Sequence, residues 1–309
     1  MPGTDISEAQ RVVFGELPDL PHLAELPARG PGADIVGRTA GLLVDLPVEL
    51  YVGRWRVAAR PGRDLRRALD LWERDLDQLT EQGEGFTGTI KVQAAGPFTL
   101  AAEVDLAGGG RLLRDPGAVR DLAASLTEGL RGHVDDVRRR LPGATVLLQV
   151  DEPGLPAVLA GRVPTESGLA AYRPVESATA TDALRSLVAA VGAPVVFHCC
   201  AADAPVSLFA AAGATALSLD LGLVTALDPL GEALDAGVGL FAGVASTDRV
   251  VRSSALADRV REIWRRLGFS PALLAAQVVV TPTCGLAGAP DAAAVLRECR
   301  EAGRRLVEE

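Results

Sequence analysis

The fold is decided by the stretch Pro194-Val195-Val196-Phe197-His198-Cys199-Cys200, an apolar run that ends in metal-ligand residue types. Its β-branched and aromatic residues favour an extended strand. Successive side chains of a strand point to opposite sides, so His198 and Cys200 share one side and Cys199 faces the other. The spacing therefore selects His198 and Cys200 as a local pair of ligands and leaves Cys199 for packing.

Two further apolar runs end in ligand residue types. Leu217-Ser218-Leu219-Asp220 ends in a carboxylate, and Thr281-Pro282-Thr283-Cys284-Gly285-Leu286 carries a thiol just past a strand. His, Cys and carboxylate side chains are zinc ligands. Repeated strand–helix units would bring these strand ends to one face of a parallel barrel, where barrel enzymes build their sites. These residue types therefore favour a zinc site at this face, and the alternative is that the cysteines are buried small hydrophobic residues.

Outward from these runs, short apolar strands alternate with helices rich in Ala, Leu and Arg. The strands are predicted at Val12–Phe14, Ile90–Ala94, Thr145–Val150, Pro194–Cys199, Ala216–Asp220, Gly239–Val244 and Gln277–Thr281, with a weaker eighth within Pro47–Ala58. The helices are predicted at Asp64–Gln82, Asp115–Leu141, Thr181–Val191, Ala204–Ala212, Ser253–Leu267 and Ala292–Val307.

This alternation predicts an α/β fold. Continuously apolar strands are typical of a parallel sheet that is covered on both faces. Eight strand–helix units in about 300 residues fit a (β/α)8 TIM barrel, with a doubly wound open sheet as the alternative. No charge run, repeat array or Pro-rich linker divides the chain, so we expect a single domain over residues 1–309.

The composition is that of a cytoplasmic enzyme. The formal net charge is −9, which argues against binding to nucleic acid or to an anionic membrane. No apolar run approaches the roughly 18 residues of a membrane span, and the first ten residues lack the apolar core of a signal peptide. Four Cys residues in 309 fit reduced thiols better than a disulfide scaffold.

Two carboxylates follow the strand Thr145–Val150 in the segment Gln149-Val150-Asp151-Glu152-Pro153. Asp151 is in a position to bind an amino group or to orient a metal ligand. For Glu152 we expect a cap on the helix that starts near Pro153, or a surface position. A nucleotide P-loop and a Gly-x-Ser-x-Gly nucleophile elbow are both absent from the sequence.

Taken together and in this order, the motifs resemble the C-terminal catalytic barrel of cobalamin-independent methionine synthases. They are Lys91-Val92 through Gly96-Pro97-Phe98-Thr99, Gln149 to Pro153, Phe197 to Cys200 and Thr281 to Leu286. The resemblance runs from about Phe14 to the last helix. It implies that His198, Cys200, Asp220 and Cys284 bind zinc, and that Asp151 contacts the amino group of homocysteine. It also implies that Gly15 and Glu16 contact substrate, because Gly15-Glu16-Leu17-Pro18 resembles the family's Gly-Ser-Phe/Leu-Pro segment.

The sequence departs from the family pattern at three places. Asp220 replaces a Glu, Glu16 replaces a Ser, and the segment Gly243–Asp248 lacks the family's proton-handling His. The separate N-terminal half of the full-length enzymes, which helps to bind methyltetrahydrofolate polyglutamate, has no counterpart. The chain therefore resembles the short, single-barrel members of the family.

The resemblance implies a methyltransferase similar to the 5-methyltetrahydropteroyltriglutamate–homocysteine S-methyltransferases. Zinc is the implied cofactor, homocysteine the acceptor, and a methylfolate or a corrinoid protein the donor. The alternatives are a zinc methyltransferase that acts on another thiol and a structural zinc-binding barrel without catalysis. A zinc-free decarboxylase of the uroporphyrinogen type is disfavoured, because its Arg-rich N-terminal signature is missing.

Overall fold

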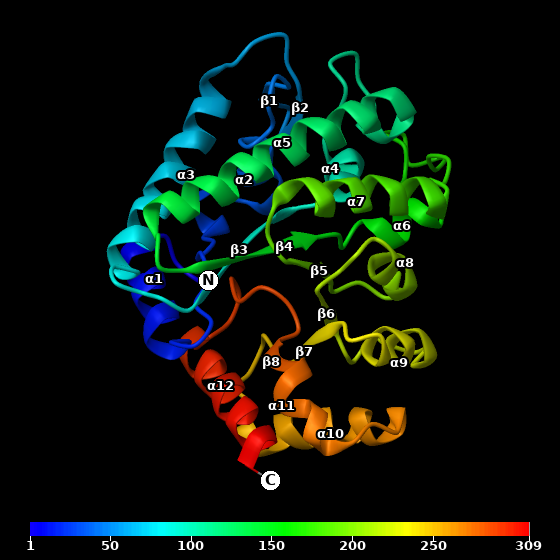
Figure 1. Ribbon diagram of the computed structural model, residues 1–309. Coiled ribbons are helices and arrows are strands. Elements are labelled where there is room, and N and C mark those ends of the chain that lie inside the picture. The colour runs from blue at the N-terminus through cyan, green and yellow to red at the C-terminus, as the bar shows by residue number, and fades with distance from the viewer. Residues whose placement is uncertain (309) are drawn as a thin grey trace.

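A curled parallel sheet of six strands forms the centre of the molecule (Figure 1). In the computed structural model, which describes residues 1–308, neighbouring strands follow one another in the chain. The strands are β3 Thr89–Ala95, β4 Thr145–Asp151, β5 Val195–Cys199, β6 Ala216–Asp220, β7 Gly239–Ala245 and β8 Val278–Pro282. A doubly wound sheet reverses its strand order at a switch point. The sequential order therefore excludes that alternative and is the order of a barrel.

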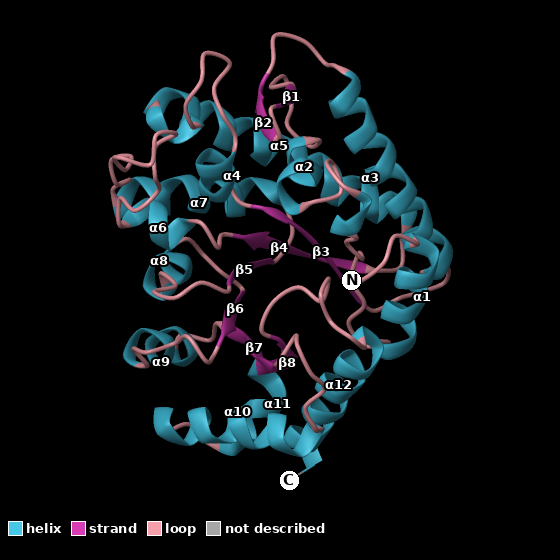
Figure 2. Cartoon of the chain, turned by 180° about the vertical axis from the view of Figure 1, so that it is seen from behind, coloured by secondary structure: helices cyan, strands magenta, loops and turns pink. Residues whose placement is uncertain are grey.

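The helices surround the outer side of this sheet (Figure 2). The longer ones are α3 Arg63–Gln82, α5 Pro116–Arg140, α7 Ser177–Val191, α8 Val206–Ala211, α9 Asp228–Asp235, α10 Ser253–Leu267 and α12 Ala292–Glu308. The shorter ones are α2 Ile35–Ala40, α4 Pro97–Glu103, α6 Leu155–Leu159 and α11 Leu274–Gln277, with 3-10 turns at Pro27–Arg29, Leu112–Arg114 and Pro271–Leu273. No helix among the described residues is long and apolar enough to cross a membrane.

Local sequence explains why these helices form. In α5, the Asp115 side chain accepts hydrogen bonds from the amides of Gly117 and Ala118, and Pro116 occupies the first turn. In α3, the buried residues recur every three or four positions and form one apolar stripe, namely Leu65, Ala68, Trp72, Leu76 and Leu79. Both predicted helices are therefore confirmed to within a few residues.

The predicted first strand at Val12–Phe14 is wrong, because these residues lie in helix α1, Ile6–Glu16. The Asp5 side chain caps the amides of Ser7 and Glu8, and the buried residues Ala9, Gln10 and Val13 have helical spacing. A short apolar run cannot distinguish a strand from one face of a helix. Here the Asp5 cap and the burial of one helical face favour the helix.

A short extended segment, Pro21–Leu23, occupies the position beside β3 instead. The Leu23 amide donates to the Lys91 carbonyl over 3.0 Å, and the Lys91 amide donates to the Pro21 carbonyl over 2.9 Å. On the other edge, the buried Gln10 side chain donates to the His22 carbonyl and accepts from the Ala24 amide, at 2.8 and 2.9 Å. A side-chain amide of α1 thus takes the place of a neighbouring strand's peptide group.

The weaker eighth strand, predicted within Pro47–Ala58, is extended as expected but does not belong to the central sheet. Residues 47–58 form an antiparallel hairpin, β1 Val48–Tyr51 and β2 Arg54–Val57, that does not join the six-stranded sheet. Its turn residues Val52 and Gly53 both have positive φ, the conformation that two-residue hairpin turns favour. Within the described residues, β8 pairs only with β7. The described strands therefore form a curled, barrel-like parallel sheet, and the full eight-stranded barrel that we predicted is not confirmed.

Candidate metal centre

The strand register brings a row of inward-facing residues to the same level. Asp151 on β4 is paired with His198 on β5, and His198 is paired with Ser218 on β6. On the opposite side of β5, Phe197 stacks on Phe209 of α8 with the ring centres 4.9 Å apart. Because side chains alternate along a strand, His198 faces the interior of the curled sheet.

The contacts of His198 fix its tautomer. Its Nδ1 lies 3.1 Å from the Ser218 carbonyl oxygen and 3.0 Å from Ser218 Oγ. A carbonyl oxygen can only accept a hydrogen bond, so Nδ1 must carry the proton. This leaves the lone pair on Nε2, and a histidine held in this way is oriented to bind a metal ion.

His198, Cys200 and Cys284 come together although Cys284 is far from the other two in the chain. One ligand atom from each lies within 4.8 Å of the other two. The sulfur atoms of Cys200 and Cys284 are 3.5 Å apart, and all four cysteines are free thiols. Two sulfur ligands at about 2.3 Å from a tetrahedral zinc ion lie about 3.8 Å apart. The residue types and their spacing therefore fit a zinc ion.

The three groups also change one another's protonation. The hydrogen bond between Cys200 and Cys284 and the contact with His198 lower the pKa of Cys284 to about 4. The same hydrogen bond and burial raise the pKa of Cys200 above its usual range. Burial lowers the pKa of His198, but Cys284 and Asp151 outweigh it, so that this pKa is raised overall. The cluster thus already favours a thiolate, the form of cysteine that binds metal.

The structure does not bring Asp220 into this group. Its Oδ1 accepts a hydrogen bond from the Gly222 amide over 2.9 Å, in the turn that ends β6. Together with Cys199, Asp220 lines a cavity of about 540 Å³ beside α8 and α9. A side chain one methylene shorter than Glu is more readily captured by its own backbone.

Asp151 lies at the end of β4, buried within the sheet. The Gln149 side chain donates to its Oδ1 over 2.6 Å. Burial raises the pKa of Asp151 to about 6, against the opposing effect of His198. Asp151 is therefore a buried acid beside the group formed by His198, Cys200 and Cys284, which we call the His–Cys group. One of its carboxylate oxygens is held by the side-chain amide of Gln149.

Gly15 and Glu16 have a different neighbourhood. They lie at the end of α1, where Glu16 forms an ion pair with Arg297 of α12 over 2.6 Å. The Gly15 carbonyl accepts a hydrogen bond from Arg300 of the same helix over 3.3 Å. Because the predicted strand is a helix, this segment ends against an outer helix, and the structure does not bring it to the His–Cys group.

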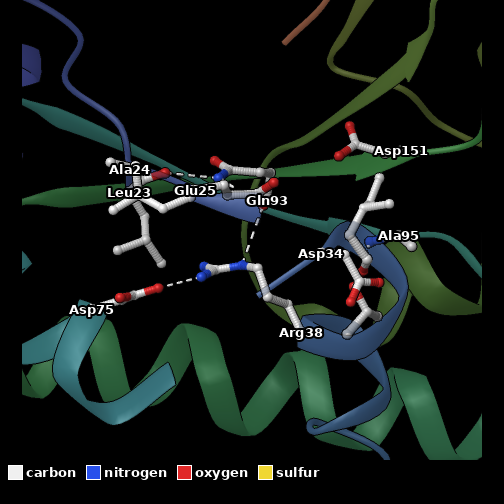
Figure 3. A network of polar contacts seen from close by, with 12 residues as sticks. Leu23, Ala24, Glu25, Asp34, Arg38, Asp75, Gln93, Ala95 and Asp151 are labelled. Atoms are coloured by element: carbon white, nitrogen blue, oxygen red, sulfur yellow. Dashed lines mark hydrogen bonds and ion pairs between the residues drawn. The ribbon is translucent and has the colours of Figure 1, made fainter. Parts of the chain in front are cut away.

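The sequence-based prediction missed a set of polar residues beside Asp151, shown in Figure 3. The Gln93 amide donates to the Leu23 carbonyl and to Glu25 Oε1, at 2.7 and 3.0 Å. Lys91 Nζ donates to Gln93 Oε1 over 3.3 Å, and burial lowers the pKa of Lys91. Polar residues at alternate positions of an apolar strand were the signal that Lys91 and Gln93 face inward.

A buried ion-pair network supports this part of the interior (Figure 3). Arg38 of α2 lies 3.5 Å from Glu25 and contacts Asp75 of α3. Arg29 forms two further hydrogen bonds with Asp75, at 2.7 and 2.8 Å. Glu25 is therefore held between the cationic side chain of Arg38 and the amide of Gln93.

Glu152 is a cap, but of a different helix from the one we expected. Its carboxylate accepts hydrogen bonds from the amides of Phe98 and Thr99, at 2.9 and 2.7 Å, and so caps α4 across space. Burial raises the pKa of Glu152 to about 7. A side chain at Gly96 would overlap the carboxylate, since its Cβ would lie 2.3 Å from Glu152 Oε1. This contact fixes α4 to the end of β4, next to Asp151.

Solved structures resemble this fold at low sequence identity. A methyltransferase from Methanosarcina mazei superposes with a TM-score of 0.62 at 14% identity, covering 97% of this chain and 84% of that chain. A B12-independent methionine synthase from Shewanella sp. W3-18-1, in complex with selenomethionine, gives a TM-score of 0.55 at 12% identity. That match covers 82% of this chain and 70% of the other.

The sequence itself carries the family assignment. No curated protein matches the chain. The model of the family described as "Cobalamin-independent synthase, Catalytic domain" matches residues 2–304, which include every residue of the His–Cys group. The chain therefore belongs to the family of the cobalamin-independent synthase catalytic domain.

Proposed function

We propose that this chain is a zinc-dependent methyltransferase that transfers a methyl group to the thiol of homocysteine and so produces methionine. The observation that carries the proposal is the group of His198, Cys200 and Cys284 at the ends of β5 and β8. Three protein ligands with a further open position are typical of catalytic zinc sites, whereas structural sites close with four. The exposure of Cys284 supports an open site.

Zinc bound in this group would hold the substrate sulfur as a thiolate, the nucleophilic form of a thiol. The chain's own contribution is positioning. Ser218 orients His198 through Nδ1, and the backbone at the ends of β5 and β8 places the two thiols. Holding both reactants in line lowers the barrier to methyl transfer.

Asp151 is the proposed partner of the substrate's amino group. An ammonium group that leaves water needs a carboxylate partner. Asp151 lies in the same row as His198, and Gln149 leaves one of its oxygens available. Glu25, whose charge helps to raise the pKa of Asp151, and Gln93, which donates a hydrogen bond to Glu25, would complete the polar wall around the amino acid part of the substrate.

The methyl donor is a methylfolate or a methylated corrinoid protein. The segment Gly243–Asp248, where the family's His is missing, begins in the last residues of β7 and continues past its end, at the same end of the sheet as the thiols. We also retain Gly15 and Glu16 as proposed substrate contacts and Asp220 as a proposed ligand, each to be tested by substitution.

The proposal is tested by measuring metal content and thiol binding on the same preparations. We expect one zinc per chain, and homocysteine binding that disappears when zinc is removed with a chelator. Cys200→Ser and Cys284→Ser should each lose most of the zinc. Cys199→Ala is the matched control, because its buried side chain faces the opposite side of β5.

Two results would contradict the proposal. Unchanged zinc content in both serine variants would exclude the His–Cys group as the metal site. Bound zinc that does not bind homocysteine would instead indicate a structural zinc-binding barrel without catalysis. Methyl transfer is then assayed with methylfolate and with a methylated corrinoid protein in parallel, and the donor that yields methionine is identified.

A further inference from the structure

The two thiols of the His–Cys group come from separate parts of the fold. Cys200 directly follows β5, and Cys284 lies in the irregular loop between β8 and α12. Their sulfur atoms are 3.5 Å apart. We propose that Cys200 and Cys284 form a reversible disulfide whenever the site holds no metal ion, so that the centre is also a redox modification site. The proposal depends on the sulfur geometry and not on methyl transfer.

The geometry requires only a small movement. A disulfide has an S–S distance of about 2.05 Å, so the sulfur atoms must approach by about 1.5 Å. Cys284 is exposed, and it lies just past the end of β8. A Cβ at the next residue, Gly285, would meet no atom within 4 Å. The loop therefore has space to bring Cys284 toward Cys200, which is held at the end of its strand.

The reaction balances with hydrogen peroxide as the oxidant. The exposed Cys284 sulfur is oxidised to a sulfenic acid, and the peroxide is reduced to water. The Cys200 sulfur then attacks the Cys284 sulfur, the S–O bond breaks, and a second water leaves. In sum, two thiols and one peroxide give one disulfide and two water molecules.

The other two cysteines are excluded by their positions. Cys199 faces the outer side of β5 and is 1% exposed, and Cys299 lies in α12 and is 2% exposed. The pairing is therefore specific. It also removes both sulfur ligands at once and leaves His198 as the only member of the group able to bind metal. Metal binding and the disulfide exclude one another.

The experiment compares the protein of residues 1–309 after removal of metal with the same protein loaded with zinc, each treated with a small excess of hydrogen peroxide. In the metal-free protein, free thiols should fall from four to two, and peptide mapping should identify a Cys200–Cys284 crosslink. A thiol reductant should restore four thiols and the uptake of zinc. In the zinc-loaded protein, crosslinking should be slower and should release zinc in step with thiol loss.

Matched variants decide the outcome. Cys199→Ala should crosslink like the wild type, and Cys284→Ser should form no intramolecular disulfide. A crosslink that involves Cys199 or Cys299, equal thiol loss in Cys284→Ser, or four unchanged thiols in the metal-free wild type would overturn the proposal. If the crosslink forms and no methyl transfer is detected, the disulfide stands and the proposed function fails.

Discussion

At the scale of single residues, the centre depends on which side of a strand each side chain faces. His198 and Cys200 face inward, as their spacing predicted, and Cys199 packs outward. Ser218, opposite His198 on β6, supplies the hydrogen-bond acceptors that fix the histidine tautomer. The histidine that we propose as a zinc ligand is therefore oriented by the protein itself.

Asp151→Asn tests the amine site. Asn retains an oxygen that can accept the hydrogen bond from Gln149 but removes the charge. Charge-assisted hydrogen bonds contribute about 1.5–3 kcal/mol, so homocysteine binding should weaken by roughly 10- to 100-fold. Calorimetry should show a much smaller effect on an alkyl thiol that lacks the amine. Equal losses for both thiols would make Asp151 a structural residue, and loss of zinc would make it a metal residue.

Asp220→Ala tests whether this carboxylate contacts the metal site. In the structure Asp220 lies outside the His–Cys group and accepts a hydrogen bond from the Gly222 amide, but as a proposed ligand it should contribute to zinc binding, so Asp220→Ala should weaken zinc affinity. Removing a side chain that orients a metal ligand typically lowers metal affinity by about 10- to 100-fold. Competition with a chelator can measure a change of this size. A loss of that size would show that Asp220 moves to the metal or to His198.

At the scale of elements, helix α1 supplies hydrogen bonds to the free edge of the extended segment Pro21–Leu23, where a neighbouring strand would otherwise supply them. Gln10 pairs with the backbone of His22, in the extended segment beside β3, and of Ala24, which directly follows that segment. This contact holds the segment that leads into Glu25, next to Asp151. The helix that replaced a predicted strand thus supports the polar wall of the site.

Gln10→Leu tests this contact. The substitution keeps the side chain's size but leaves the His22 carbonyl and the Ala24 amide without their partner. Each unpaired buried group costs about 1–3 kcal/mol, so the free energy of unfolding should fall by roughly 2 kcal/mol or more. Urea unfolding measures the loss, and Arg11→Leu, at an exposed position of α1, is the control. Equal stability of wild type and Gln10→Leu would mean that water replaces the amide.

At the scale of the whole molecule, stability depends on a buried histidine outside the site. His133 of α5 packs against Trp72 of α3 with the ring centres 4.7 Å apart, and neither ring nitrogen has a hydrogen-bond partner. Burial and then the charge of Arg38 lower the pKa of His133 to about 3. The folded protein therefore keeps this ring neutral at a pH where the unfolded chain protonates it.

The pH dependence follows from this difference. Between pH 6.5 and about 3, the unfolded state binds a proton that the folded state does not, so stability falls as the pH falls. At pH 5 the loss is about 2 kcal/mol, from about 1.4 kcal/mol per unit below 6.5. His133→Phe should remove this loss, and its stability relative to wild type should rise from pH 7.5 to pH 5.

The comparison with the variant is necessary because other groups titrate in the same range. The raised pKa values of Asp151 and Glu152 mean that these groups stabilise the folded state as the pH falls, the opposite sign. Denaturant unfolding of both proteins at several pH values isolates His133 by difference. If the difference in unfolding free energy between wild type and His133→Phe does not change with pH, His133 is protonated equally in the folded and unfolded states.

The sequence by itself determined what depends on local chemistry. The alternation of strands and helices, the inward pair His198 and Cys200, and the position of Cys284 past a strand all follow from side-chain period and residue type. The family and the enzyme class, a methyltransferase, were predicted from the same motifs and are confirmed by the match over residues 2–304. These features could be predicted because neighbours in the chain define them.

Only the tertiary structure decided the features that depend on distant partners. Val12–Phe14 became a helix because a cap and a buried face outweighed a three-residue apolar run. Glu152 caps α4, more than fifty positions away in the chain. Glu25 comes near enough to Asp151 to raise its pKa only through the pairing of Pro21–Leu23 with β3. Such contacts form between residues that no local pattern connects, and the energy of burying and pairing them decides the outcome.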